Sequence, residues 1–206
     1  MYFGEILIEK SIGNILGHTL NLDGKKLSKG KKITSQDVKA LKANGYKSII
    51  CAKSNINDLH EDKIAKNIGK LFINNTVISE DPYTGRVNLL ASKSGLLNID
   101  EKLIEKFNST SEDVTIATLK NYSKVNKGDM IATIKIIPFY VSSKVLNKIK
   151  KLLLKKSLLI HTFLRKKVGL ILTHSKNENN KLNNISIKRI SERLTKLNSS
   201  LTKVIT

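Results

Sequence analysis

The stretch Lys167-Val168-Gly169-Leu170-Ile171-Leu172-Thr173 decides the fold class of this chain. It is apolar from Val168 to Leu172 and has the length of a β-strand rather than of a helix. Such short apolar runs are typical of parallel sheets that are covered on both faces. A polar loop over 174–184 follows, and a helix is expected over 185–197. This order predicts the start of a parallel α/β sheet over residues 161–206, which is expected to be incomplete, as a fragment or a natural truncation.

Residues 1–55 predict a separate module made of a β-hairpin, a helix and a strand, with a β-barrel-like character. The pair Asp23-Gly24 stands between short apolar segments and favours a hairpin turn with positive φ at both positions. Thr34 is suited to cap a helix, with Asp37 at the third helical position, and Asn44-Gly45 is suited to end it. A strand is then expected from Tyr46 to Ala52.

Residues 56–160 predict a mixed α/β domain. One helix is expected over 56–75 with Asp58 as its cap, and a second begins at Asp100. A third begins at Ser142 or Ser143 and reaches about Lys156. The expected strands are Thr76–Ser79, Asp81–Leu89, Val114–Leu119 and Ile131–Val141. The chain as a whole is therefore expected to be of the α/β class.

The composition is strongly basic, with 37 Lys and Arg against 17 Asp and Glu and a formal net charge of +20. Such a charge raises the prospect of nucleic-acid binding. Only four of the 37 basic residues are Arg, however, and Arg is the residue best suited to paired phosphate and base contacts. Lys, Asn and Ile all have A/T-rich codons, so a biased genome explains most of the charge. Nucleic acid is not the expected partner.

The sequence also predicts the compartment. Cys51 is the only cysteine, which excludes an internal disulfide and fits a reducing environment. No apolar segment is long enough to span a membrane, and the first residues lack the basic and apolar pattern of a secretory signal. A cytoplasmic protein is expected. The chain has no phosphate-binding glycine loop and no nucleophile elbow, so these residues by themselves indicate no reaction.

Four segments, taken in order, resemble one protein family. They are Gly17-His18-Thr19-Leu20 with Gly24 to Gly30; Thr84-Gly85-Arg86-Val87-Asn88-Leu89; Gly128-Asp129-Met130-Ile131-Ala132-Thr133-Ile134-Lys135-Ile136-Ile137-Pro138-Phe139; and Lys167-Val168-Gly169-Leu170 with the tail Lys188 to Leu194. Together they resemble a bacterial molybdopterin-binding family that is related to molybdopterin molybdenumtransferase. Its members are often fused to a nucleotidyltransferase domain. The resemblance covers about the whole chain.

The resemblance implies a function in molybdenum cofactor biosynthesis. The expected ligand is molybdopterin, free or adenylylated, or the molybdenum cofactor itself, with Mg²⁺ as a further candidate. The implied partners are a nucleotidyltransferase domain or protein and a second copy of the chain in a homodimer. In the related transferases the strand that corresponds to Val168–Thr173 leads into a Thr-Gly-Asp-Glu loop. This chain reads Thr173-His174-Ser175-Lys176 instead, so it is expected to bind a ligand rather than to be catalytically complete alone.

Six residues are candidates for the ligand site. Thr173, His174 and Ser175 follow a predicted strand and precede a predicted helix, which is where ligands bind in open α/β sheets. The other three are Thr84, Gly85 and Arg86. Arg86 can pair with a phosphate through its planar fork, or it can hold its turn by bonding Asp81 or backbone carbonyls. No metal ligands are expected, because the histidines lack Cys or carboxylate partners at ligand spacing.

Two alternatives stay open. One is an active molybdopterin molybdenumtransferase, against which the missing acidic loop counts, because carboxylates normally handle Mg²⁺. The other is a basic nucleic-acid-binding module, which would bind DNA or RNA with an affinity that falls steeply with salt.

Overall fold

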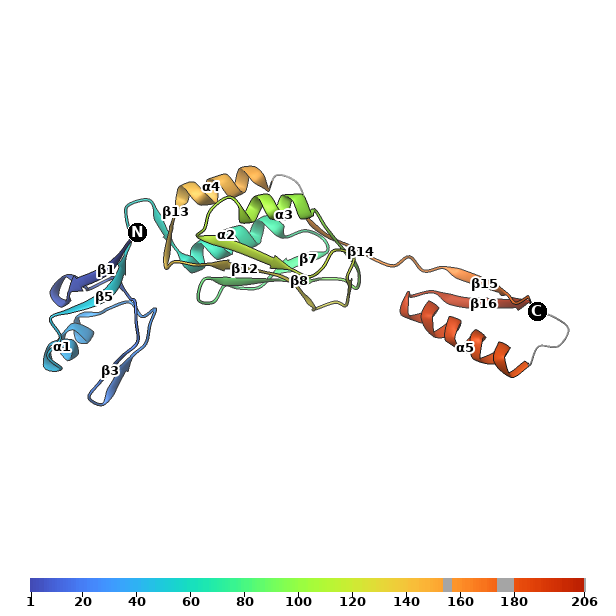
Figure 1. The fold of residues 1–206 in the computed structure, drawn as a ribbon, viewed down its shortest axis with the longest axis horizontal. Helices are drawn as coiled ribbons and strands as arrows, with labels where there is room; N and C mark the ends of the chain where they lie inside the picture. Colours follow the sequence, from blue (N-terminus) through green and yellow to red (C-terminus); the bar gives the residue numbers. More distant parts are fainter. Residues whose placement is uncertain (154–156, 174–179, 206) are drawn as a thin grey trace.

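The computed structural model describes residues 1–153, 157–173 and 180–205. The elements form three units along an elongated molecule (Figure 1). The N-terminal unit runs from β1 to β5, the central unit from β6 to β14, and the C-terminal unit from β15 to β16. Helices are interspersed with strands along the whole chain, so it has the mixed α/β class that its sequence predicts. None of the helices in the described part of the chain is long and apolar enough to cross a membrane.

The N-terminal unit is a small sheet with one helix against it. Its strands run antiparallel in the order β1-β5-β2, and a separate hairpin joins β3 to β4. Its core contains Leu16, Leu27, Leu41 and Cys51, each exposed by 1% or less. Burial raises the pKa of the Cys51 thiol to about 11, which keeps it un-ionised and unreactive. The elements are β1 (Tyr2–Leu7), η1 (Ile8–Lys10), β2 (Ile15–Leu16), β3 (Leu20–Leu22), β4 (Lys25–Leu27), α1 (Ser35–Ala43) and β5 (Ser48–Lys53).

The predicted hairpin is confirmed, but its turn geometry differs from the prediction. Leu22 pairs with Lys25 across the two-residue turn. Gly24 has a φ of 71°, whereas Asp23 is not among the residues of positive φ. Only the glycine therefore adopts the left-handed conformation at this turn.

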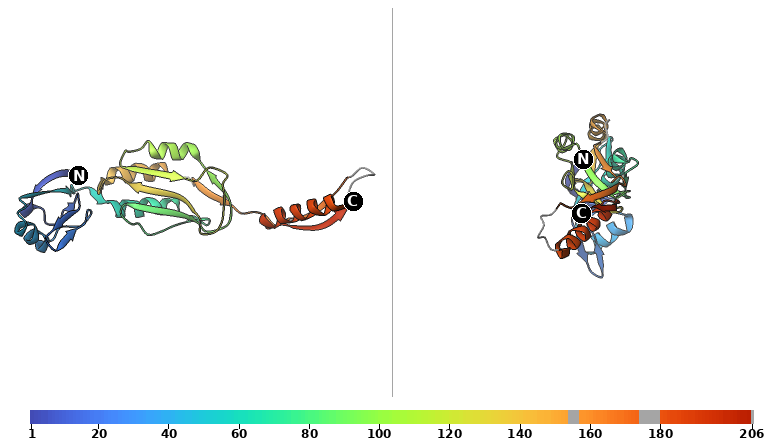
Figure 2. Two further views of the ribbon diagram at one scale, coloured as in Figure 1. Left: turned by 60° about the horizontal axis from the view of Figure 1, so that its bottom comes forward. Right: turned by 90° about the vertical axis from the view of Figure 1, so that its right-hand side faces the viewer.

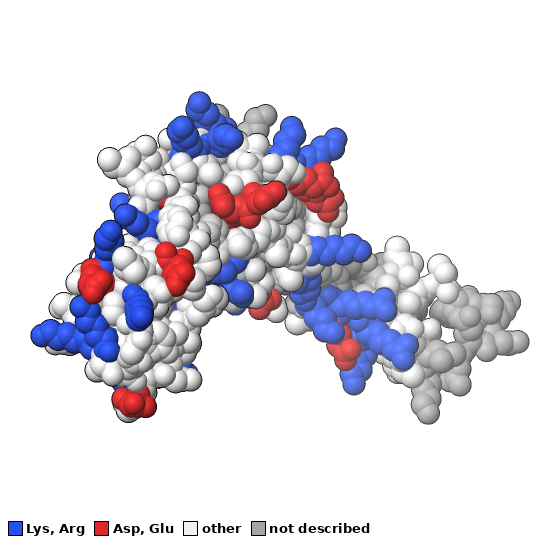
Figure 3. Space-filling model, turned by 60° about the vertical axis from the view of Figure 1, so that its left-hand side comes forward, with Lys and Arg blue, Asp and Glu red and all other residues white. Residues whose placement is uncertain are grey.

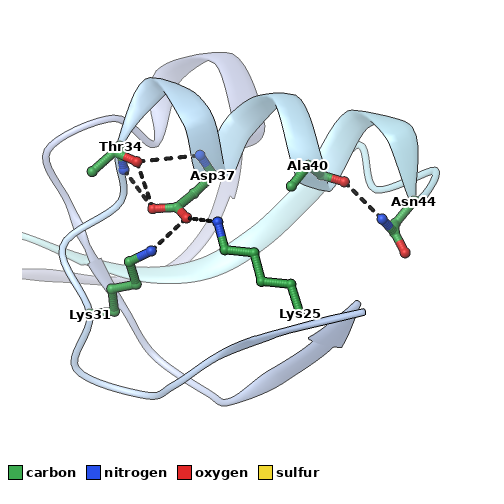
Figure 4. Close-up of polar contacts among 6 residues, drawn as sticks. All are labelled: Lys25, Lys31, Thr34, Asp37, Ala40 and Asn44. Carbon is green, nitrogen blue, oxygen red and sulfur yellow. Dashed lines mark hydrogen bonds and ion pairs between the residues drawn. The ribbon is translucent and has the colours of Figure 1, made fainter. Parts of the chain in front are cut away.

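The helix α1 begins with the capping box that the sequence predicts (Figure 4). The Thr34 hydroxyl accepts a hydrogen bond from the Asp37 amide, and the Asp37 carboxylate accepts one from the Thr34 amide at 3.1 Å. The same carboxylate is buried and pairs with Lys25 at 3.0 Å and with Lys31. Burial by itself raises the pKa of this carboxyl. The hydrogen bonds from Lys31, Lys25 and Thr34 outweigh burial and hold the pKa well below its ordinary value.

The central unit packs three helices against curved antiparallel sheets (Figures 1 and 2). The larger sheet has the order β10-β12-β8-β7, and the smaller has the order β11-β9-β14. The helix α2 lies across β8 and β12, and α4 contacts both α2 and α3. The elements are β6 (Asp58–His60), α2 (Glu61–Phe72), β7 (Val77–Ser79), β8 (Arg86–Ala91), β9 (Gly95–Ile99), α3 (Glu101–Asn108), β10 (Val114–Thr118), β11 (Lys124–Val125), β12 (Met130–Ile136), β13 (Tyr140–Ser142), α4 (Ser143–Leu152) and β14 (Leu158–His161).

Two of the predicted helix starts in this unit are confirmed and one is wrong. Asp100 caps α3, and Ser142 caps α4. Asp58 does not cap α2, because it lies in the short strand β6 and pairs with the amino group of Met1 at 2.9 Å. The cap of α2 is His60, whose Nδ1 accepts a hydrogen bond from the Asp62 amide at 3.3 Å.

The C-terminal unit is a strand, a helix and a parallel strand. Its elements are β15 (Lys167–Ile171), α5 (Asn180–Lys196) and β16 (Ser200–Ile205). The sequence predicts that β15 is covered on both faces of its sheet, and this prediction is wrong within this chain. Ile171 is 70% exposed and Ile205 is 46% exposed, because the described residues supply only α5 as a cover. The helix also begins earlier than predicted, at Asn180.

The capping box gives a first test of the fold. Changing Asp37 to Asn should lower the free energy of unfolding by about 2 kcal/mol at neutral pH, because a buried, multiply bonded acceptor loses its charge. The folded-state pKa is depressed, so this stability is present above the ordinary value of about 3.9 and is lost as pH falls through the folded pKa. Denaturant melts at a series of pH values should show that the difference in unfolding free energy between the wild type and the Asn variant shrinks as pH falls below about 3.9.

Asp81→Asn is the matched control. Asp81 pairs with Lys66 at 2.9 Å, but its side chain is 88% exposed. Its loss should leave the unfolding midpoint almost unchanged. An Asp37 variant as stable as the wild type at neutral pH would contradict the role given to this carboxylate.

Candidate functional site

The turn at Thr84-Gly85 forms one end of the candidate site. Tyr83 and Arg86 exchange backbone hydrogen bonds at 2.9 and 3.0 Å, which closes a two-residue turn. Thr84 has a φ of 48° and Gly85 a φ of 69°. Positive φ at both positions defines the mirror-image turn that matches the twist of hairpin strands. Glycine satisfies this requirement without strain, whereas the β-branched Thr84 does so at a cost.

Both backbone polar groups of Gly85, its amide and its carbonyl, are hydrogen-bonded. Its amide donates to Asp62 Oδ1 at 2.7 Å, and its carbonyl accepts from the Ile136 amide at 2.7 Å. A Cβ at this position would clash with the carboxylate of Glu61. The glycine therefore allows the turn to sit directly against the first turn of α2.

Glu61 is the buried acid of the site. The residue is 8% exposed, and Lys135 Nζ lies 3.8 Å from its carboxylate. The same ammonium donates to the Thr84 carbonyl at 2.6 Å. Burial raises the pKa of the Glu61 carboxyl, although Lys135 opposes the shift. A carboxyl in this state can act either as an acceptor or as a donor and acceptor together.

The N-terminal unit supplies the opposite wall. Lys29 and Gly30 face Phe139, and Lys29 Nζ lies 5.8 Å from the centre of the Phe139 ring. Phe3 stacks beside Phe139 with the ring centres 6.5 Å apart, and His18 meets Phe3 edge-on at 6.2 Å. The result is a cleft of about 270 Å³ with one acid, two ammonium groups and an aromatic ring. It is lined by Lys29, Gly30, Glu61, Thr84, Lys135, Ile137 and Phe139.

The predicted site residues do not all meet in this cleft. Thr84 lines it and Gly85 lies directly behind it. Thr173 is exposed and follows β15, which Figure 1 shows in the C-terminal unit, at the other end of the molecule from the N-terminal unit. His174 and Ser175 lie outside the described residues.

Arg86 points to a different surface. Its side chain is exposed, and it lines a separate depression beside Asp81 and Tyr83. Neither role expected for Arg86 within its turn is seen among the described residues. Asp81 pairs with Lys66 instead, and the turn is closed by the backbone of Tyr83 and Arg86. The phosphate-pairing alternative for Arg86 stays a prediction.

The sequence reasoning missed the two residues that give the cleft its charge pair. Glu61 lies in the first turn of a helix, where acidic residues are common because they favour the helix N-terminus, so its type and position alone do not mark it as a site residue. Lys135 is one of 33 lysines. The available signal was the distinctive Lys135-Ile136-Ile137-Pro138-Phe139 segment, of which Lys135, Ile137 and Phe139 line the cleft.

No family model, no curated protein and no solved structure matches this chain. Within the described ranges, no group of three or more His, Cys, Asp or Glu side chains is arranged to hold a metal ion.

The contacts of Gly85 provide a test of the geometry. Gly85→Ala should lower the free energy of unfolding by about 2–3 kcal/mol, because the new Cβ combines a left-handed φ with a clash against Glu61. Gly128→Ala is the control, since Gly128 has a φ of 92° but no atom within 4 Å of its added Cβ. Its cost should be about 1 kcal/mol, from the backbone alone. Equal costs in urea melts of the two variants would contradict the close approach of Glu61 to the turn.

Proposed function

We propose that this chain binds molybdopterin, free or adenylylated, and acts in molybdenum cofactor biosynthesis. One observation supports the proposal most. Three of the four segments that carry the family resemblance, far apart in the sequence, contribute to the cleft. They are represented there by Gly30, Thr84 and Phe139.

The chemistry of the cleft suits a phosphorylated pterin. The amino-oxo edge of a pterin carries neighbouring donor and acceptor groups, which a carboxyl such as Glu61 can pair with in either protonation state. The flat ring can lie against Phe139. Lys29, on the opposite wall from Glu61, supplies positive charge for the phosphate end of the ligand, whereas Lys135 stays paired with Glu61.

The size of the cleft limits how much of the ligand it holds. Its volume of about 270 Å³ is just below the range of roughly 300–1,000 Å³ that is typical of small-molecule pockets. We therefore infer that the pterin head enters and that the rest of the ligand extends outward.

A second contact surface is part of the same proposal. The position between a strand and a helix predicts Thr173, His174 and Ser175 as ligand residues. Thr173 follows β15 in the C-terminal unit, whereas the cleft lies between the N-terminal and central units. One ligand can touch both surfaces only if they come from two copies. The proposal therefore includes a homodimer, a cytoplasmic location and a nucleotidyltransferase domain or protein as the next partner.

A fluorescence titration with molybdopterin tests the proposal. The wild-type chain should bind saturably, and Glu61→Gln should weaken binding about tenfold or more, because the substitution removes a charge-assisted hydrogen bond. Glu9→Gln is the matched control, since Glu9 is exposed and pairs with Lys42 away from the cleft. Its affinity should match that of the wild type.

Lys29 separates the phosphate from the pterin contribution. Lys29→Gln should reduce the affinity for molybdopterin and leave the weaker affinity for a pterin without phosphate unchanged. Failure of the wild-type chain to bind molybdopterin saturably, or identical affinities of the Glu61 and Glu9 variants, would refute the cleft as the pterin site.

A further inference from the structure

A second hollow lies where the central and C-terminal units meet. Its volume is about 640 Å³, more than twice that of the cleft. Four lysines line it, and they come from three different parts of the chain: Lys93, Lys124, Lys127 and Lys196. Figure 3 shows a group of blue side chains, with few red ones among them, at this junction. We call it the lysine hollow.

Two loops of the central unit line one side of the lysine hollow and are hydrogen-bonded to each other. The Lys127 amide donates to Ser94 Oγ at 2.9 Å, which ties the turn after β11 to the loop between β8 and β9. The Gly128 amide donates to the Ala91 carbonyl at 2.8 Å, and the Ala91 amide donates to the Asp129 carbonyl at 2.9 Å. Lys93 and Lys127 are therefore carried on two loops whose backbones are fixed to each other.

The end of α5 forms the third wall. The helix closes with Asn198 at a φ of 57°, and the Ser199 amide donates to the Leu194 carbonyl at 2.8 Å. Lys124 Nζ lies 3.5 Å from the Lys196 carbonyl oxygen, which links the central unit to this helix end. The Lys166 amide donates to Ser199 Oγ at 3.1 Å and holds the incoming chain against the same end.

The positive charge of the lysine hollow is not neutralised locally. No Asp or Glu is among its described lining residues. The nearest carboxylate along the turn, that of Asp129, accepts hydrogen bonds from the Asn126 amide at 2.7 Å and from the Asn126 side chain at 3.4 Å. It is therefore engaged within its own turn. The four lysines also appear in none of the ion pairs found in the described part of the chain.

We propose that the lysine hollow binds a diphosphate group, either free or as part of an ester. Lysine ammoniums are compact point charges that suit phosphate oxygens. A phosphate monoester carries roughly 1.5 to 2 negative charges near neutral pH, and a diphosphate carries more, so it comes closer to the charge of four lysines than a single phosphate group does. The site is separate from the cleft and does not depend on the pterin proposal.

Calorimetric titration of the full chain with inorganic pyrophosphate, without magnesium and at physiological ionic strength, tests the proposal. Saturable binding is expected, and orthophosphate and sulfate should bind at least about tenfold more weakly because they engage fewer ammoniums. Lys93→Gln with Lys127→Gln should weaken pyrophosphate binding about tenfold or more. A parallel titration with adenosine diphosphate separates the sources: equal affinity indicates recognition of the diphosphate alone, and tighter affinity indicates an esterified ligand.

Lys148→Gln with Lys151→Gln on α4 is the matched control, because it removes the same charge from an exposed helix face. Its affinity for pyrophosphate should stay within about twofold of the wild type. Since folding could be affected, Lys124→Gln with Lys196→Gln is a second, independent variant that should lose binding in the same way. Equal losses in the control pair, or orthophosphate and sulfate binding as tightly as pyrophosphate, would overturn the proposal. So would single-stranded DNA that displaces pyrophosphate and binds more tightly than it does.

Discussion

The two backbone hydrogen bonds of Gly85 fix the arrangement on which the cleft of the central unit depends. The amide binds the Asp62 carboxylate at the start of α2, and the carbonyl binds the Ile136 amide at the end of β12. One residue thus joins a helix, a hairpin turn and a central strand. Because Gly85 has no side chain, Glu61 and Thr84 come close enough to share the ammonium of Lys135. The positions of Glu61 and Lys135 in the cleft follow from this contact.

The contacts of the acidic residues explain why the positive charge of this chain is unevenly distributed over its surface. Several carboxylates are engaged in the fold itself, as in the capping box of Asp37 and the ties made by Asp58 and Asp62. Carboxylates used in this way do not screen lysines elsewhere on the surface. The excess charge is therefore concentrated at particular places, of which the lysine hollow is one. A compositional bias toward Lys can supply the charge, but the fold decides where it is left unpaired.

The C-terminal unit differs from the other two in how it is stabilised. Its two parallel strands have α5 as their cover, and their apolar side chains remain substantially exposed, as at Ile171 and Ile205. Parallel sheets are normally covered on both faces. The proposed homodimer and the proposed nucleotidyltransferase partner both offer surfaces that would cover these strands.

Local signals in the sequence determined the class of the fold and most helix starts. Thr34, Asp100 and Ser142 cap helices because a short polar side chain can bond to the free amides just beyond it, and this needs no distant partner. The cap at Asp58 failed because the Met1 amino group, distant in sequence, binds that carboxylate instead. The short strands β6, β9 and β14 were missed for a related reason, since their pairing partners lie far along the chain.

Only the tertiary structure decided the candidate sites. The sequence indicated Thr84 and Gly85 because they lie in a segment that carries the family resemblance. Lys29 and Lys135 lie in such segments too, but neither they nor Glu61 were singled out, because a charged residue in a sequence carries no sign of its burial or of its partner. Their role depends on which side chains lie close together in space. Burial and the approach of an ammonium to a carboxylate are set by packing between elements, and no short stretch of sequence contains that information.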